Sequence, residues 1–554
     1  MSVVLGINAV FHDPAAALVV DGELVAAAEE ERFSRRKHGK PCVPFSTWEL
    51  PEQAARFCLD VVGLHPSDVD AVGYSYDPAL ATDGGAGGGQ VWDDETADPE
   101  WEALRTLYAR RAPAFLRTAL PGLRDDVVHH VPHHLAHAAS AWGAVPAESC
   151  AVMVLDGRGE RGSYLAGVAH EGRLEVLAVQ DLPHSLGLRY EELTAHLGYR
   201  RSSDEYKVMA LASYGRPAHL EPFRTHLRTT GDGGFVTEAI DWHEYAPEGH
   251  GDGSIAPQHA DLASTMQVRL EEVLLELADW LHDRTGERTL CLAGGVALNC
   301  VANSRLHRDG PFEQIWVQPA AGDAGTALGA AWHVATQLGD RPRPMRTAAL
   351  GPSWEDDEVE RSLNDARVRY EVPDDIAAAT AEVLAQDGLV AWFQGRSEFG
   401  PRALGHRSLL AHPGHLHNLR RLNDVKGREQ FRPVAPMVRL EAAADLVEDG
   451  PVPSPFMLFT HTVRPEWASR VPAVVHVDGT ARLQTVASDD EPLVHRLLTS
   501  FEQRTGLPVL VNTSLNTAGR PMVDSPRDAL ECFGSSPIDA LAIGPFLVRR
   551  DGAW

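Results

Sequence analysis

Short apolar runs separated by turn residues predict the same series of strands twice in the first half of the chain. The first series has three strands, at Val3–Asn8, Ala15–Val20 and Leu24–Ala28. The second also has three, at Ala151–Leu155, Ser163–Ala169 and Leu174–Val179. Helical periodicity follows each series, at Gln53–Val62 and at Asp261–Arg284. In both series an acidic residue and a glycine join the last two strands, as in a two-residue hairpin turn. The duplication predicts an α/β domain of the actin-like/ribonuclease-H-like type, which holds a ligand between its halves.

Shifts in composition divide the rest of the chain. Residues 82–100 are rich in glycine and acid and predict a mobile surface loop. Residues 338–356 are rich in proline, arginine, glycine and acid, and predict a linker that ends a first domain at about residue 347. A second α/β domain, residues 348–554, is then expected. Its predicted elements are a helix at Ile376–Asp387 and strands at Leu389–Phe393 and Leu507–Val511.

Length and charge narrow the class of protein. A chain of 554 residues is long enough for two to four domains with substantial cores. A net charge of −28 repels polyanions and argues against nucleic acid or an anionic membrane as partner. No apolar run is long enough to span a membrane, and Met1–Asp21 lacks the basic start of a signal peptide. The six cysteines form no C-x-x-C pair, so we expect a reduced, cytoplasmic protein, with a homodimer as one possible assembly.

Histidines that suit a metal ion gather in one short segment. Five lie within nine residues, at His129, His130, His133, His134 and His137. Three i,i+4 pairs result, and spacing alone does not choose among them. Pro132 suits a first helical turn, which places His133 and His137 inside the helix. Asp156 and Asp323 each follow a strand, where ligands collect in α/β folds, although either could simply cap the next turn. Together the four side chains suit iron(II) or another divalent first-row metal.

Positive charge is concentrated between Arg396 and Arg439. This stretch has nine basic and three acidic residues in a chain that is strongly acidic overall. Arginine forks and lysine ammonium groups bind phosphate, so the segment predicts an anion site with Arg402 beside glycine turns. Arg482 and the polar turn Val511–Asn516 follow strands and could reach the same ligand. The chain has only four lysines, so a remaining one such as Lys426 could be kept for its compact ammonium.

Four motifs, in order along nearly the whole chain, resemble one family. They are His133–Ser140, Glu205–Gly215, Ser397–Ser408 and Asn512–Asn516. The combination resembles the nodulation-protein-U-like O-carbamoyltransferases, which include antibiotic enzymes acting on cephems, aminoglycosides, aminocoumarins and ansamycins. After the first metal-type aspartate that family usually has Asp-Gly-Val-Gly-Glu. Here the sequence is Asp156-Gly-Arg158-Gly-Glu160, and the added guanidinium could pair with a local acid or approach an intermediate.

The resemblance implies a division of labour between two domains. The first would be like the tRNA threonylcarbamoyl-transfer protein and the second YrdC-like. The second would convert carbamoyl phosphate and ATP, with Mg²⁺, into carbamoyl adenylate. The first would use iron(II), or another divalent metal, to pass the carbamoyl group to a hydroxyl of a small natural-product acceptor. The implied metal ligands are His133, His137, Asp156 and Asp323. Those implied for nucleotide and carbamoyl phosphate are Arg402, Lys426, Arg432, Arg482, Asn512 and Ser514. Lys37 and His12 fall on positions lining the transfer site, where His12 would act as general base or only orient the acceptor.

Rival functions make different predictions. A tRNA threonylcarbamoyl-transfer enzyme would share both domain types, but it would have to bind tRNA despite the acidic charge. An actin-like small-molecule kinase would release ADP, whereas adenylate formation releases AMP and pyrophosphate. A metallopeptidase of H-E-x-x-H type is excluded because no glutamate follows His133. A non-catalytic metal-binding scaffold would consume no carbamoyl phosphate.

Overall fold

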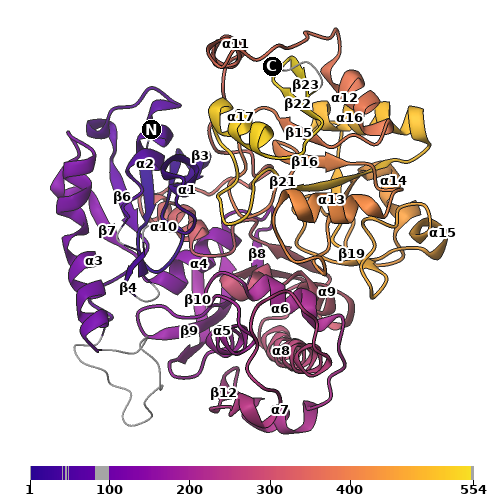
Figure 1. Ribbon diagram of the computed structural model, residues 1–554. Helices are drawn as coiled ribbons and strands as arrows, with labels where there is room; N and C mark the ends of the chain where they lie inside the picture. The colour runs from indigo at the N-terminus through magenta and orange to yellow at the C-terminus, as the bar shows by residue number, and fades with distance from the viewer. Residues whose placement is uncertain (1, 40, 44–45, 48, 82–98, 551–554) are drawn as a thin grey trace. The chain divides into compact units, whose positions relative to one another are not determined.

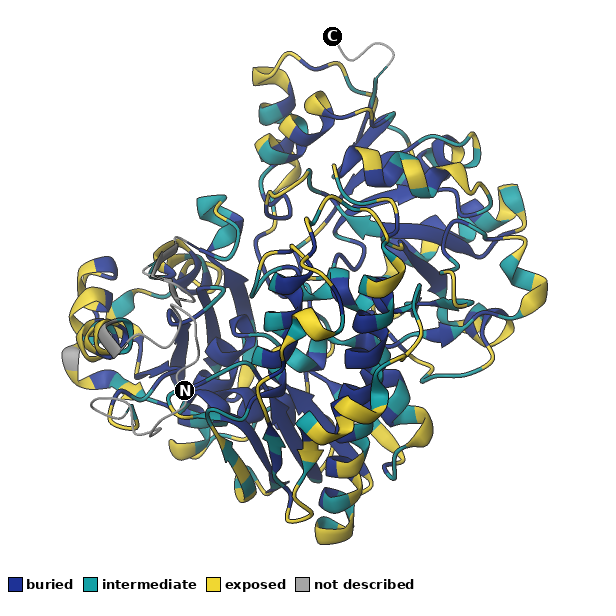
Figure 2. Ribbon diagram, turned by 60° about the horizontal axis from the view of Figure 1, so that its bottom comes forward, coloured by how far each residue is buried: buried dark blue, intermediate teal, exposed yellow. Residues whose placement is uncertain are grey.

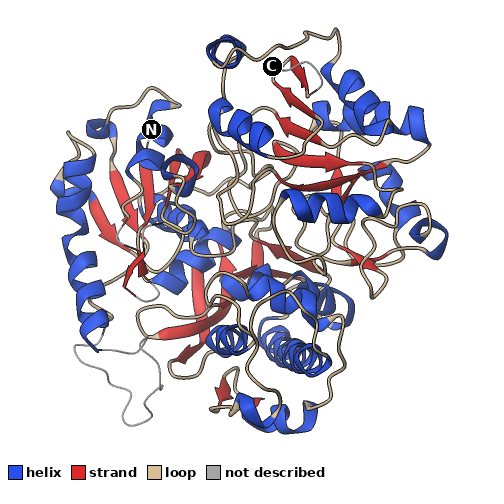
Figure 3. Cartoon of the chain, in the orientation of Figure 1, coloured by secondary structure: helices blue, strands red, loops and turns tan. Residues whose placement is uncertain are grey.

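The computed structural model describes residues 2–39, 41–43, 46–47, 49–81 and 99–550, and the chain divides into two compact units. Unit 1 runs from Met1 to Met345 and unit 2 from Arg346 to Trp554 (Figures 1 and 3). The loop expected at 82–100 falls almost entirely outside the described residues. Among the described residues, no helix is long and apolar enough to cross a membrane. Five cysteines are buried and form no disulfide, namely Cys58, Cys150, Cys291, Cys300 and Cys532.

Unit 1 contains two five-stranded sheets with the same strand order. The first sheet is β3-β2-β1-β6-β7, and the second is β10-β9-β8-β13-β14. The strands of the first are β1 Val3–Asn8, β2 Ala15–Val20, β3 Glu23–Glu29, β6 Ala71–Tyr74 and β7 Val128–His130. Those of the second are β8 Ser149–Leu155, β9 Gly162–His170, β10 Arg173–Asp181, β13 Thr289–Ala293 and β14 Gln314–Val317. In each, three antiparallel strands are followed by two parallel ones. The predicted duplicated actin-like fold is confirmed by this topology.

The two hairpin turns show how local sequence sets this repeat. Asp21 and Gly22 have φ angles of 49° and 77°, and Glu171 and Gly172 have the same values. A two-residue turn with both central residues at positive φ matches the right-handed twist of the flanking strands, and glycine adopts the second position without strain. The equal geometry fixes the same register in both copies.

Helix α10, Ala324–Gln337, packs between the two sheets of unit 1, against α4, His133–Trp142, and β1. Close approach requires glycine at the contacts. A Cβ on Gly329 would lie 1.7 Å from the carbonyl oxygen of Ala136 in α4, and a Cβ on Gly6 would lie 1.8 Å from that of Ala327. Such overlap forces the backbone apart, so these glycines let the two helices and β1 meet. The contact brings the start of α10 close to the histidines of α4.

The remaining elements of unit 1 surround the two sheets. The helices are α1 Glu31–Ser34, α2 Glu52–Asp60, α3 Pro99–Ala119, α5 Leu186–His196, α6 Glu205–Ala212, α7 Leu220–His226, α8 Pro257–Thr285 and α9 Cys300–Asp309. The short strands are β4 Pro41–Val43, β5 Ser46–Thr47, β11 Leu227–Thr229 and β12 Phe235–Thr237.

Unit 2 is built on one mixed seven-stranded sheet in the order β20-β17-β21-β16-β15-β22-β23. Its strands are β15 Val390–Phe393, β16 Arg407–Ala411, β17 Ala435–Arg439, β20 Gln484–Val486, β21 Val509–Ser514, β22 Ala540–Ile543 and β23 Phe546–Arg549, with β18 His461–Thr462 and β19 Thr480–Ala481 apart. Its helices are α11 Asp356–Asp365, α12 Ile376–Ala385, α13 His417–Val425, α14 Leu440–Leu446, α15 Pro465–Ala468, α16 Pro492–Thr505 and α17 Pro526–Ser535. The sheets of both units are mostly buried (Figure 2).

Candidate functional site

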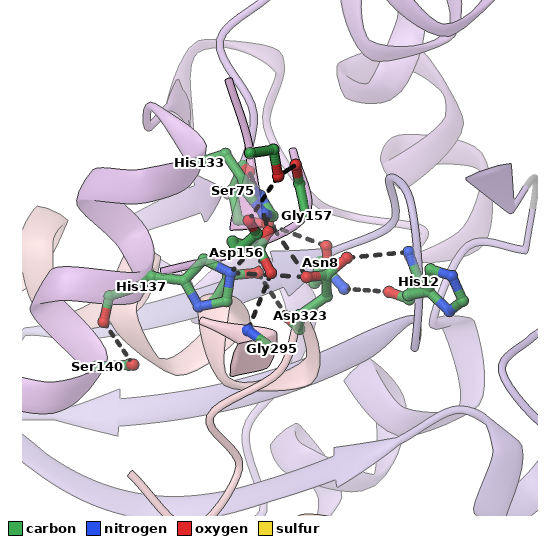
Figure 4. Close-up of polar contacts among 12 residues, drawn as sticks. Asn8, His12, Ser75, His133, His137, Ser140, Asp156, Gly157, Gly295 and Asp323 are labelled. Carbon is green, nitrogen blue, oxygen red and sulfur yellow. Dashed lines mark hydrogen bonds and ion pairs between the residues drawn. The ribbon is translucent and has the colours of Figure 1, made fainter. Parts of the chain in front are cut away.

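Four side chains from three elements of unit 1 converge on one point (Figure 4). His133 and His137 lie one turn apart on α4, Asp156 follows β8, and Asp323 immediately precedes α10. The Nε2 atom of His133 is 3.3 Å from Asp156 Oδ2 and 3.6 Å from Asp323 Oδ1. The Nε2 atom of His137 is 3.7 Å and 3.6 Å from the same two oxygens. One ligand atom from each residue lies within 4.8 Å of the others, so the structure brings together all four predicted metal ligands.

The cluster is sealed from solvent, and its charges act on one another. Both imidazoles are fully buried, and the two carboxylates are about a tenth exposed. Burial alone would raise the pKa values of Asp156 and Asp323, but the imidazoles outweigh it and hold both carboxyl pKa values below the ordinary range. Burial would lower the pKa of His133, and the two carboxylates instead raise it well above its ordinary value.

The donor set fits a divalent first-row metal ion. Among the described residues, neither ring nitrogen of His137 has a hydrogen-bond partner, although both are buried. The His133 Nδ1–H faces the carbonyl of Ser75 at 3.3 Å, which leaves Nε2 directed into the cluster. Asp156 Oδ1 accepts the Gly295 N–H at 2.9 Å, so its other oxygen faces the imidazoles. Two nitrogen and two oxygen donors, each oriented by a second contact or left unpaired, are typical of a site for such an ion.

Asp323 does not serve as a helix cap, which was the alternative explanation for its position. It occupies the N-cap position of α10, yet its side chain makes no capping hydrogen bond. Its Oδ2 atom instead accepts the backbone N–H of His12 at 3.1 Å. The loop after β1 is therefore tied directly to the cluster.

Glu160 supports the cluster and was not recognised as functional from the sequence. Pro132, at the N-cap of α4, offers no side-chain acceptor. The Glu160 carboxylate accepts the His133 backbone N–H at 2.9 and 3.2 Å, and also the Asp77 N–H at 2.8 Å. A carboxylate at a helix N-terminus satisfies free N–H groups and favours the helix dipole. The only sequence signal was its place at the end of the Asp156–Glu160 stretch.

The other histidines of the segment lie outside the cluster. His129 and His130 belong to strand β7, before the helix, as Pro132 predicted. His134 is buried on α4, and burial together with the charge of His133 lowers its pKa to about 3. A Cβ on Gly159 would lie 2.7 Å from the His134 ring, so glycine is needed there. Of the three i,i+4 pairs, only His133 and His137 meet both carboxylates.

His12 and Lys37 lie beside the cluster without being part of it. Asn8 Nδ2 donates to the carbonyl oxygens of His12 and Asp13, at 2.7 and 3.0 Å, and so fixes the loop after β1. The His12 ring contacts the His38 ring edge-on, with centroids 5.7 Å apart. Lys37 precedes His38, and its charge is one of those that lower the pKa of Asp13.

Arg158, which departs from the expected motif, has a local partner. Its guanidinium forms an ion pair with Glu102 of α3, and the same carboxylate also binds Arg105. Both guanidiniums lie over the ring of Phe11, at 5.6 and 5.0 Å from its centroid. Phe11 in turn contacts the His133 ring at 5.2 Å. Arg158 thus pairs with a local acid at the edge of the cluster.

In unit 2, three predicted polar residues meet on and beside β21. Lys426, after α13, donates its ammonium to the Ser514 carbonyl at 2.6 Å and to the Ser514 hydroxyl at 2.9 Å. Asn512, on the same strand, donates to the carbonyl of Ala403 at 3.0 Å and to Gln484 Oε1 at 2.8 Å. Among the described residues, the buried Asn512 Oδ1 has no hydrogen-bond partner. Gln484 was not predicted as a site residue from the sequence. Its side-chain amide donates to the Leu404 carbonyl oxygen at 2.7 Å, which joins β20 to the loop that contains Ala403 and Leu404.

The three predicted arginines of unit 2 lie in segments with different contacts to β21. Arg402 precedes Ala403 in a loop held by Glu398, whose Oε1 accepts the N–H groups of Leu404 and His406 at 2.6 and 3.0 Å. Arg482 lies two residues before Gln484. Arg432 pairs with Glu429 at 3.6 Å. The contacts thus link the segments carrying Arg402 and Arg482 to β21, and the Arg432 guanidinium forms an ion pair with Glu429.

Many cations between Arg396 and Arg439 hold the fold together. Arg407 is fully buried, donates to the carbonyls of Gln394 and Pro352, and lies 3.7 Å over the ring of Phe393. Other arginines with acceptors inside unit 2 are Arg396, Arg421, Arg428 and Arg439. The net charge of the segment therefore overstates what is available to an external anion.

Fold and cluster define a two-unit α/β protein whose actin-like unit carries a buried group of metal-ligand side chains. Two family models match the chain: Carbamoyltransferase N-terminus over residues 3–79 and 115–332, and Carbamoyltransferase C-terminus over 381–550. The chain therefore belongs to the carbamoyltransferase family, and carbamoyl transfer is the activity that this membership assigns to it.

Two relatives match this chain over most of their own length. Nodulation protein NolNO of Sinorhizobium fredii is 37% identical, with 98% of this chain and 80% of that protein covered. Nodulation protein U of Rhizobium tropici is 31% identical, covering 92% of this chain and 90% of the relative. Among solved structures, Thermococcus kodakarensis HypF aligns with a TM-score of 0.33 and 14% identity, over 61% of this chain and 48% of that one.

Proposed function

We propose that this carbamoyltransferase is ATP-dependent and works in two steps, one in each unit. Unit 2 would use water to split carbamoyl phosphate into carbamate and phosphate. The carbamate oxygen would then attack the α-phosphorus of ATP, which forms carbamoyl adenylate and releases pyrophosphate. Unit 1 would pass the carbamoyl group to an acceptor hydroxyl and release AMP. The observation that carries the proposal is the convergence of four metal-ligand side chains within 4.8 Å in the actin-like unit of a carbamoyltransferase.

The polar residues of unit 2 suit the adenylate-forming step. Arg402, Arg432 and Arg482 would bind the phosphates of ATP and carbamoyl phosphate, with Mg²⁺ accompanying ATP. Asn512 supports this role because its buried Oδ1 has no hydrogen-bond partner among the described residues and could accept from a ligand. Lys426 and Ser514, already hydrogen-bonded to each other, would place a point charge and a hydroxyl beside it.

The cluster in unit 1 suits the transfer step. A divalent ion such as iron(II), held by His133, His137, Asp156 and Asp323, would supply Lewis acidity toward the carbamoyl carbonyl. The protein itself limits the access of bulk water, because both imidazoles are fully buried and the carboxylates are only about a tenth exposed. His12, tied through its backbone to Asp323, and Lys37 would line the approach of the acceptor.

The proposed acceptor is a small hydroxylated natural product of the kind found in antibiotics. This class of acceptor is the one implied by the resemblance to the nodulation-protein-U-like O-carbamoyltransferases. The net charge of −28 is unfavourable for a tRNA, because it repels the phosphate backbone.

The test is incubation with ATP, Mg²⁺, iron(II) under anaerobic conditions, carbamoyl phosphate and a panel of hydroxylated scaffolds. Mass spectrometry should detect a carbamate adduct, with AMP and pyrophosphate formed in equal amounts. Release of ADP would favour a kinase, and binding of tRNA at low salt would favour a tRNA-modifying enzyme. Binding of metal without any consumption of carbamoyl phosphate would favour a non-catalytic metal-binding scaffold.

A further inference from the structure

A second hydrogen-bonded group lies beside the metal-ligand cluster, and the functions proposed above do not use it. His38 Nδ1 is 2.8 Å from Asp13 Oδ1, and His38 Nε2 is 3.1 Å from the Ser203 hydroxyl. The three residues come from the loop after β1, the segment after α1 and the loop before α6. A carboxylate can accept only from an N–H, so in the neutral ring Nδ1 carries the proton and Nε2 is left to accept the serine hydroxyl. A carboxylate, an imidazole and a hydroxyl in this order form a base that removes a proton from an alcohol.

The backbone around the group is held in uncommon conformations. Asp13, His38 and Ser202 have φ angles of 47°, 62° and 55°, in the left-handed region that side chains other than glycine seldom adopt. Backbone in this region is strained, and it persists only where the surrounding structure enforces it. Three of them at one hydrogen-bonded group point to a site that is functionally constrained.

Both ends of the group adjoin the cluster. At one end, Asp13 follows His12, whose N–H donates to Asp323 at 3.1 Å. At the other, Ser202 precedes Ser203 and donates its hydroxyl to Glu191 at 2.9 Å. The Glu191 carboxylate lies against Gly157, the residue after Asp156. The side chains of Asp13 and His38 are 29% and 27% exposed, so a substrate can reach them, whereas the cluster histidines are sealed.

His38 is better placed as a base than His12. Both nitrogens of His38 are fixed by partners, which sets its tautomer and its orientation. The His12 ring contacts the edge of the His38 ring and has a nitrogen within 4.8 Å of an Asp13 carboxylate oxygen, but within the described residues no hydrogen bond fixes its orientation. A base needs a positioned nitrogen within hydrogen-bond distance of the proton it removes, and only His38 already holds a hydroxyl there.

We propose that His38, oriented by Asp13, is the general base that removes the proton from the acceptor hydroxyl. This inference rests on the proposed function. The proton moves from the acceptor oxygen to His38 Nε2. The oxygen forms its bond to the carbamoyl carbon, and the bond from that carbon to the AMP oxygen breaks, with the electron pair leaving on AMP. The Ser203 hydroxyl marks the position at Nε2 that the acceptor hydroxyl takes.

The charges that face His38 define its pH response. They come from four segments and are Asp13, Glu31, Lys37, His12 and Glu205. Burial would lower the pKa of His38, and the carboxylates of Asp13 and Glu31 outweigh it, so the pKa lies above the ordinary value. Only neutral His38 accepts a proton, so the transfer rate rises with pH through this raised pKa. Loss of the Asp13 charge lowers the pKa of His38 and moves the rise to lower pH.

The test is the pH profile of carbamoyl transfer for the full chain and four variants. The acceptor is the scaffold that gives an adduct in the panel, or water if none does. Asp13→Asn should lower the maximal rate by about a hundred- to ten-thousand-fold and move the acid limb to lower pH. His38→Asn should lower the rate similarly and remove the limb. His12→Asn and Ser203→Ala should keep the limb at the wild-type pH, whatever their rates.

A second measurement covers variants that fold poorly. In NMR spectra of protein labelled at histidine Cε1, the His38 resonance is the one that His38→Asn lacks. The pKa obtained from this resonance should lie above the ordinary histidine value, and Asp13→Asn should lower it. An acid limb that disappears with His12→Asn, or that stays in place with Asp13→Asn, would overturn the role of His38 alone. Wild-type protein that transfers no carbamoyl group would overturn the proposed function, and this inference with it.

Discussion

The two units present polar sites of opposite character. In unit 1, two carboxylates and two imidazoles point their lone pairs at one buried position, while their other atoms are held by backbone groups or left unpaired. In unit 2, the Lys426 ammonium is hydrogen-bonded to the Ser514 hydroxyl, and both this ammonium and the Asn512 amide donate to main-chain carbonyls. The first arrangement is suited to a cation, and the second to anionic ligands that compete for the same donors.

The difference shows which residue types reveal a site in a sequence. Two carboxylates buried side by side repel each other and lose their hydration unless positive charge lies between them, so their convergence with two imidazoles has few structural explanations. Arginines stabilise a fold readily, and the fully buried Arg407 does so through main-chain carbonyls. A dense run of arginine is therefore weaker evidence for a ligand than two histidines and two aspartates.

Removal of a ligand from unit 1 should have the largest effect. Asp156→Asn keeps the size of the side chain but removes the negative charge that faces both imidazoles. Affinity for iron(II) should fall more than about a hundred-fold, since even residues behind the ligands contribute ten- to a hundred-fold. Carbamoyl transfer should be lost with it. Metal content by mass spectrometry and calorimetric titration of the metal would measure the change.

The matched control is His129→Ala, which removes an exposed histidine of the same segment that belongs to another i,i+4 pair. It should bind metal as the wild type does. Equal loss in both variants would mean that the histidine-rich segment binds metal without the aspartates. Unchanged binding in Asp156→Asn would exclude the four-residue cluster as the site.

Removal of a cation from unit 2 should have a smaller effect confined to one step. Arg402→Ala should slow adenylate formation about a hundred- to a thousand-fold, because one donor to developing charge is lost. Transfer from preformed carbamoyl adenylate should continue at the wild-type rate. Exchange of labelled pyrophosphate into ATP would follow the first step, and carbamate formation the second. If both steps fail together, the division of labour is wrong.

The control for that variant is Arg420→Ala, an exposed arginine on α13 in the same basic segment. Adenylate formation should stay at the wild-type rate. If Arg420→Ala slows adenylate formation as much as Arg402→Ala does, the positive charge of the whole segment supports this step and Arg402 has no specific role.

Lys426 tests whether the internal hydrogen bonds of unit 2 preorganise its site. Lys426→Met keeps an apolar stem and removes the ammonium that donates to Ser514. The KM for carbamoyl phosphate or ATP should rise about ten- to a hundred-fold, which corresponds to one charge-assisted hydrogen bond. Lys426→Arg should restore little, because a planar fork does not replace a point charge. Unchanged KM values for both substrates would show that the ammonium has only a structural role.

Local signals made much of the first unit predictable. Strands β1 and β2 have the predicted bounds, since their apolar runs end at turns that glycine and aspartate mark. His133 and His137 followed from Pro132, which fixes where the helix begins. In unit 2, helix α12 ends at Ala385, before the predicted Asp387, whose φ of 66° lies outside the helical region.

Contacts between distant segments were not predictable in the same way. His38 and Ser203 are 165 positions apart, and no periodicity links them. Strand β7 was not predicted from the sequence. Its two histidines are typical of the polar residues that precede a helix, and its pairing with β6 depends on a distant segment. Partners of arginine are also set by the fold, so charge alone did not show that Arg407 binds carbonyls or that Arg158 binds Glu102.

Arg158 gives the smallest and most discriminating prediction. Arg158→Val introduces the residue that the resemblance led us to expect, and removes the ion pair with Glu102 and the contact with Phe11. Glu102 keeps its ion pair with Arg105. The free energy of unfolding should therefore fall by only about 1 kcal/mol, as for other partly exposed ion pairs. The midpoint of thermal unfolding should fall by about 2 °C. Arg161→Ala, whose partner Asp181 is half exposed, should shift it less. If Arg158→Val instead slows carbamoyl transfer with no change in unfolding, the guanidinium contacts the reacting groups and does more than hold Glu102.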